Sequence, residues 1–76
     1  MMISAQQVRA ARGWLGWSQA ELAAISGISR RTIVEIEKGS RVSQERTLAD
    51  LRRTFELKGM EFLFANDQPV GVKLRN

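Results

Sequence analysis

The sequence contains no cysteine and no histidine. Without cysteine it has no disulfide framework and no thiolate metal site, and without histidine it lacks the most common general base and metal ligand. No apolar run approaches the roughly 20 residues that span a bilayer, and the N-terminus lacks a signal-peptide core. We therefore expect no metal site, no membrane segment and, by default, a cytoplasmic protein.

The sequence also lacks the motifs of common catalytic sites. It has no glycine-rich phosphate loop, no metal-ligand spacing and no pairing of a nucleophile with a base. Several of its eight acidic residues fall at expected helix caps or beside basic residues at helical spacing, and Asp67 falls in a turn. We therefore predict neither an enzyme nor a bound cofactor.

The composition is that of one small folded domain with a net positive charge. The chain has 76 residues, of which 43% are hydrophobic, and no repeat or linker divides it. Twelve Lys and Arg against eight Asp and Glu give a net charge of +4. This excess favours a nucleic-acid partner, but many small basic proteins bind no polyanion, so charge alone leaves the question open.

The most informative stretch begins at Ser18 and predicts two short helices joined by a tight turn. Ser18 and Glu21, three residues apart, form the pattern of a capping box at the start of a helix. Gly27 tolerates the positive φ of a helix-ending turn. Ser29 is a second N-cap, after which apolar residues recur at helical spacing over residues 29–38.

The spacing within this stretch predicts a helix-turn-helix, whose second helix lies in the major groove of DNA. Ala23, four residues before Gly27, lets the two helices cross closely, and Ile28, Ile33 and Ile36 fill the angle between them. The stretch resembles the helix-turn-helix of the phage-repressor/Cro-like family, often called XRE-like regulators. The resemblance is carried by Trp17-Ser18-Gln19, Glu21-Leu22-Ala23, Gly27-Ile28-Ser29, Thr32-Ile33 and Ile36-Glu37-Lys38-Gly39.

Helical periodicity extends to both sides of the motif. Apolar residues at positions 8, 11 and 15 predict a first helix from about Ala5 to Gly13, and Trp14 and Trp17 flank the next turn as partly buried residues. A polar loop over residues 40–45, with Ser40 or Ser43 as the cap, leads into a helix that ends at Gly59. Its inward residues are Leu48, Leu51 and Phe55, and Arg52, Arg53 and Glu56 are expected on its solvated side.

The C-terminal residues change to the alternating pattern of strands, separated by a turn at Asn66-Asp67-Gln68-Pro69. We therefore expect a helix-turn-helix DNA-binding domain at residues 1–59 and a β-hairpin at residues 60–76. The resemblance covers about Val8 to Phe55 without insertions and implies a mainly α fold. This fold is a lambda-repressor-like four-helix DNA-binding domain, to which the short hairpin is added.

The exposed residues at the start of the recognition helix are the candidates for reading bases, since this end approaches base edges. Arg30 and Arg31 each suit guanine, whose O6 and N7 one arginine bonds together. Many members of the resembled family carry glutamine in place of Arg30, so this substitution indicates a guanine in the half-site, or a contact of Arg30 with phosphate. Glu35 either accepts from a cytosine N4 or orients Arg31. The alternative is that these charges are only solvated.

The resemblance also implies phosphate contacts and one structural ion pair. Gln19 opens a helix whose N-terminus favours anions, and the family's glutamine here touches a DNA phosphate. Arg12 is expected to pair with Glu37, which would tie the first helix to the end of the recognition helix. Residues after that helix either flank the opposite phosphate strand or form only a charged loop. The predicted DNA-binding residues are Gln19, Ser29, Arg30, Arg31, Thr32, Glu35, Lys38, Ser40 and Arg41.

We predict a sequence-specific regulator, most simply a repressor, that binds double-stranded DNA as a homodimer. One recognition helix covers only a few base pairs, so specificity needs two half-sites about 34 Å apart. The candidate dimerisation residues are Phe62, Phe64, Val72 and Leu74, unless they only cover the last helix of the same chain. The alternative function is an antitoxin-type module that binds a toxin or other protein and autoregulates its operon. A third alternative is charge-driven binding of RNA or of unspecific DNA.

Overall fold

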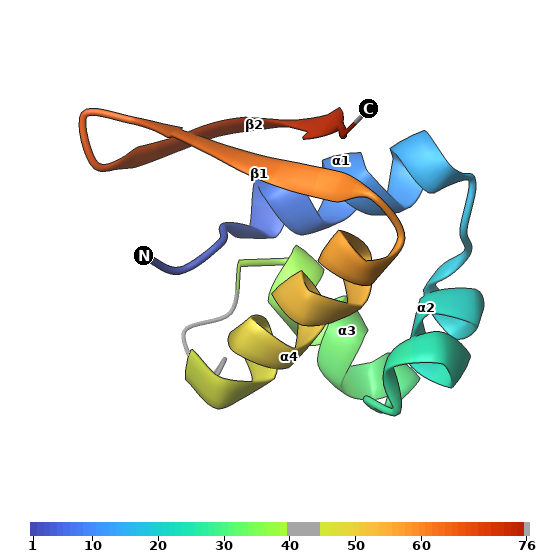
Figure 1. Ribbon diagram of the computed structural model, residues 1–76. Coiled ribbons are helices and arrows are strands. Elements are labelled where there is room, and N and C mark those ends of the chain that lie inside the picture. Colours follow the sequence, from blue (N-terminus) through green and yellow to red (C-terminus); the bar gives the residue numbers. More distant parts are fainter. Residues whose placement is uncertain (40–44, 76) are drawn as a thin grey trace.

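The computed structural model describes residues 1–39 and 45–75, which form four helices and one antiparallel hairpin, as the sequence predicts. The elements are α1 (Ala5–Leu15), α2 (Gln19–Ser26), α3 (Arg30–Glu37), α4 (Glu45–Leu57), β1 (Met60–Ala65) and β2 (Gln68–Leu74). The hairpin lies along one side of the molecule, with β2 against α1 and β1 against α4 (Figure 1). The predicted loop at residues 40–44 and its caps lie outside the described residues.

Helices α1, α2 and α3 each begin at a serine whose side chain caps the helix. Ser18 and Glu21 form the predicted capping box at the start of α2, and Ser29 accepts from the backbone N–H of Thr32 at the start of α3. Gly27 ends α2 with a φ of 77°, the left-handed conformation predicted for it. These caps depend on residues within a few positions of one another, which explains why the sequence reveals them.

Helix α1 is longer than predicted. It continues through Gly13 to Leu15, and Gly16 is the residue that adopts the left-handed conformation, with a φ of 71°. The N–H of Gly16 donates to the carbonyls of Arg12 and Gly13, which closes the last turn. The prediction that α1 ends at Gly13 is therefore wrong, because a glycine in a helix weakens it without stopping it.

The core lies between the helices and the inner face of the hairpin. Its largest fully buried side chains are Phe55, Leu22, Ile33, Leu51, Met60 and Val8. The ring of Trp17 stacks on Phe55 with the centroids 5.7 Å apart, and Phe62 meets Phe55 edge-on at 5.9 Å. Trp14, in contrast, is 62% exposed, so only Trp17 has the partly buried position expected for both.

The hairpin turn is tighter than predicted. Only Asn66 and Asp67 lie between the strands, and both have positive φ, at 52° and 63°. Paired positive φ values are those of a type I′ turn, whose twist matches that of the flanking strands. Gln68 and Pro69 therefore belong to β2 and not to the turn. The residue opposite Leu63 is Gly71, but the residue opposite Phe64 is Pro69, so β2 carries a bulge at Val70.

Two polar side chains attach the hairpin to the helices. Gln7 is 2% exposed, and its Nε2 donates to the carbonyls of Leu63 and Gly71 at 2.9 and 3.0 Å. Arg52 was expected on the solvated side of α4, but it is half-buried and its guanidinium lies 5.4 Å from the ring centroid of Phe64. Arg52 lies over the hairpin because its guanidinium makes cation–π contacts with the aromatic rings there.

Candidate nucleic-acid interface

Helices α2 and α3 meet around Gly27 on the side of the molecule away from the hairpin (Figure 1). Ile33 and Ile36 are buried, and Ile28 packs against the same core. This packing fixes which side of α3 faces inward, since the apolar residues repeat at helical spacing. The opposite side of α3 is left at the surface.

The surface side of α3 carries most of the predicted base-reading residues. Arg30 and Arg31 are exposed at its N-terminal end. Glu35 lies one turn further, and its Oε2 is 3.7 Å from Nζ of Lys38. Among the described residues, the structure thus pairs Glu35 with Lys38 and not with Arg31, as the spacing of three residues allows. This exposed pair contributes little to stability.

The side chains of Ser29 and Thr32 meet at the N-terminal cap of α3. The Oγ of Ser29 accepts from the backbone N–H of Thr32 at 3.2 Å and donates to Oγ1 of Thr32 at 2.8 Å. Both hydroxyls are therefore already engaged within the chain. Ser40 and Arg41, which were also predicted to bind DNA, lie outside the described residues.

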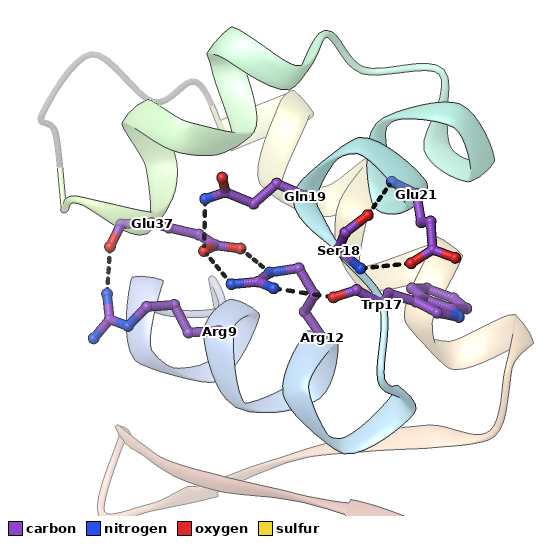
Figure 2. Close-up of polar contacts among 7 residues, drawn as sticks. All are labelled: Arg9, Arg12, Trp17, Ser18, Gln19, Glu21 and Glu37. Carbon is purple, nitrogen blue, oxygen red and sulfur yellow. Dashed lines mark hydrogen bonds and ion pairs between the residues drawn. The ribbon is translucent and has the colours of Figure 1, made fainter.

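Glu37 joins α1, α2 and α3 at one buried carboxylate (Figure 2). Glu37 is only 6% exposed. Arg12 binds it with two contacts, Nε to Oε2 at 2.8 Å and Nη2 to Oε1 at 2.9 Å. Gln19 donates from Nε2 to Oε1 at 3.1 Å. A buried carboxylate requires such compensation, and the two-pronged arginine contact is the geometry that provides it best.

The ion pair also stabilises the charged form of Arg12. The hydrogen bond and the negative charge of Glu37 raise the pKa of the Arg12 guanidinium, against the opposing effect of partial burial. Because the pKa is raised in the folded state, the stabilisation is complete below the pKa of unfolded arginine and is lost only as pH rises through the folded value. Arginine is charged at neutral pH, so the contact has its full effect there. Arg12 also donates to the carbonyl of Trp17 at 3.0 Å, which holds the start of the turn into α2.

Gln19 and Arg30 lie at the same shallow surface depression. It is lined by Arg12, Ser18, Gln19, Ala20 and Arg30. The depression therefore combines Arg30 with the first turn of α2, where the backbone N–H groups of Gln19 and Ala20 have no intrahelical acceptor. Such a combination attracts an anion such as phosphate. The amide of Gln19 is directed by its bond to Glu37, as Figure 2 shows.

Arg9 belongs to this arrangement but was not predicted. Its guanidinium donates to the backbone carbonyl of Glu37, at the C-terminal end of α3 (Figure 2). A cation there complements the helix dipole. The spacing of Arg9, three residues before Arg12 on the same face of α1, is a signal that could have pointed to it.

These features define a helix-turn-helix DNA-binding domain: two helices joined at a left-handed glycine, with an exposed basic end on the second. Residues 8–62 match the family model described as helix-turn-helix. The chain therefore belongs to this family of XRE-like regulators, as the resemblance predicts, and it is a DNA-binding transcriptional regulator whose partner is double-stranded DNA. The family is typically non-enzymatic.

A comparison with curated proteins finds no match. Within residues 1–39 and 45–75, no helix is long and apolar enough to cross a membrane. The family match extends beyond the end of α4 and includes the first residues of β1.

Proposed function

We propose that this protein is a sequence-specific repressor that binds its operator as a homodimer, with α3 in the major groove. The observation that carries the proposal is the exposed pair Arg30 and Arg31 at the start of a helix whose other end is held by Glu37. A helix fixed in this way presents its base-reading residues without losing much freedom on binding. Occupation of an operator excludes other proteins from the same DNA, so repression needs no further contact.

Arg30 and Arg31 are proposed to read guanine. Neither has an ion-pair partner among the described residues, since the pairs found there involve other side chains. Their guanidinium groups are thus available for the two-pronged contact with guanine O6 and N7. Ser29 and Thr32 support this reading indirectly, because their hydroxyls hold the first turn of α3.

Phosphate contacts are proposed at both ends of α3. The depression at the first turn of α2, beside Gln19, would hold one phosphate, and Lys38 would reach another. Arg30 and Lys38 are eight residues apart, which corresponds to about 12 Å along a helix. That length is comparable to the width of the major groove, about 12 Å. Contacts of this kind position the protein but carry no sequence information.

The hairpin is proposed as the dimerisation element, although not through all the residues first considered. Phe62 is 5% exposed and packs on its own core, so it offers no surface to a second copy. Phe64 and Val72 are half-buried against the same core. Leu74, at 45% exposed, and Val70, at 60%, remain accessible, and each strand of a two-stranded sheet has an unpaired edge.

The experiment is selection from a randomised DNA library at two salt concentrations, with the wild type, Arg30→Ala and Arg31→Ala. We expect a two-fold symmetric site. Each variant should lose preference at defined base positions, by about tenfold or more. Arg53→Ala, which removes an exposed arginine from α4, is the matched control and should keep the wild-type site.

The other outcomes separate the alternatives. A variant that flattens the salt dependence but keeps the site marks a phosphate contact. Equal affinity for unrelated duplexes would contradict the proposal and favour charge-driven binding. A protein that enriches no site alone, but co-purifies with a partner protein at fixed stoichiometry, would favour the antitoxin-type function.

A further inference from the structure

Val34 is an aliphatic residue on the surface side of α3. It lies four residues after Arg30 and four before Lys38, so these three side chains share one face of the helix. Ile33 and Ile36, which the core requires, lie on the other face and are buried. Within the described residues, the core contacts that account for Ile33 and Ile36 do not account for the apolar side chain of Val34.

The packing around the core supports this distinction. The half-buried apolar side chains that pack against the core are Leu15, Trp17, Ala23, Ile28, Phe64 and Val72. Val34 is also half-buried but does not belong to this group within the described part of the chain. Because Arg30 and Lys38 lie four residues on either side of Val34, its side chain falls between two exposed cations along the face of α3 proposed to enter the groove.

We propose that Val34 reads the C5-methyl group of a thymine in the operator. That methyl group is the apolar feature that base pairs present in the major groove, and aliphatic side chains recognise it by contact. Valine suits this role because its χ1 is nearly fixed in a helix, so little side-chain freedom is lost. The inference rests on the proposed function and adds a base preference that the arginines do not supply.

The test compares thymine with uracil, which differs only by this methyl group. Once the library selection has defined a site, each dT is replaced by dU in turn, and the Kd is measured by fluorescence anisotropy. For the wild type we expect one replacement per half-site to weaken binding about fourfold, the effect of burying one methyl-sized group. For Val34→Ala the same replacement should have no effect, and Val34→Ile should remain sensitive.

Leu57→Ala is the matched control, because it truncates an aliphatic side chain that is 78% exposed on α4. It should keep the wild-type sensitivity to uracil, and thermal unfolding of each variant verifies that it is folded. The inference is overturned if Val34→Ala keeps the sensitivity, if the wild type has none, or if the selected site has no thymine at a constrained position. A symmetric site with any of these results leaves the proposed function standing, whereas the absence of any enriched site removes both.

Discussion

Glu37 is the residue on which the orientation of the recognition helix depends. Its carboxylate accepts from Arg12 on α1 and from Gln19 on α2, and its backbone carbonyl accepts from Arg9. These partners lie 18 to 28 positions away in the sequence. One buried side chain thus joins three helices, and its removal affects both stability and the site.

Replacement Glu37→Gln should destabilise the protein by about 3 kcal/mol, because Arg12 is left without its carboxylate in a partly buried place. This is a large part of the total for a domain of this size, about 4–11 kcal/mol. The measurement is urea unfolding followed by circular dichroism. A lower midpoint with an unchanged slope would indicate lost stability without a change in the unfolded state.

The matched control for this prediction is Glu61→Gln. Glu61 pairs with Lys73 across the hairpin at 3.5 Å, but both side chains are about half exposed. Its loss should cost less than about 1 kcal/mol. Equal destabilisation by the two substitutions would contradict the role assigned to the buried pair.

At the scale of elements, the hairpin is attached to α1 by Gln7. Its amide donates to two carbonyls beside the bulge, and its Oε1 accepts from the backbone N–H of Ser4. The same side chain therefore caps α1 and holds β1 and β2.

Replacement Gln7→Ala should weaken this attachment and cost about 1–3 kcal/mol, because two partly buried carbonyls lose their donor. Hydrogen exchange should accelerate more in the strands than in α2 and α3, since the hydrogen bonds of Gln7 among the described residues go to the hairpin and to Ser4. Gln6→Ala, at the exposed neighbouring position, is the control and should leave the exchange unchanged. Unaltered protection of the strands in Gln7→Ala would show that other contacts hold the hairpin.

At the scale of the whole molecule, the hairpin and the recognition helix lie on different sides (Figure 1). A second copy could therefore pair through the hairpin without covering α3. A homodimer that binds a two-fold symmetric operator must align its own two-fold axis with that of the operator.

Replacement Leu74→Asp should shift a homodimer toward monomer, because it places a charge in the exposed apolar part of the hairpin. Sedimentation equilibrium measures this change, and circular dichroism verifies the fold. Leu57→Asp, at a more exposed position on α4, is the control and should remain dimeric. A wild type that is monomeric at all concentrations, or a Leu74→Asp variant that still dimerises, would contradict dimerisation through this surface.

Features that depend on near neighbours are predictable from the sequence alone. The box of Ser18 and Glu21, the cap at Ser29 and the left-handed Gly27 follow from residues a few positions apart. The helix-turn-helix and the exposed arginines of α3 follow from them in turn. The end of α1 and the length of the hairpin turn were mispredicted, since a glycine inside a helix and an Asn-Asp pair each permit more than one local structure.

Contacts between residues far apart in the chain became visible only in the packed fold. It buried Phe62 in its own core, turned Arg52 toward the hairpin and gave Gln7 two carbonyls more than 50 positions away. It also left Val34 outside the core while neighbouring isoleucines entered it. These contacts depend on how helices and strands pack together, and local propensity and spacing contain no information about the partner that packing supplies.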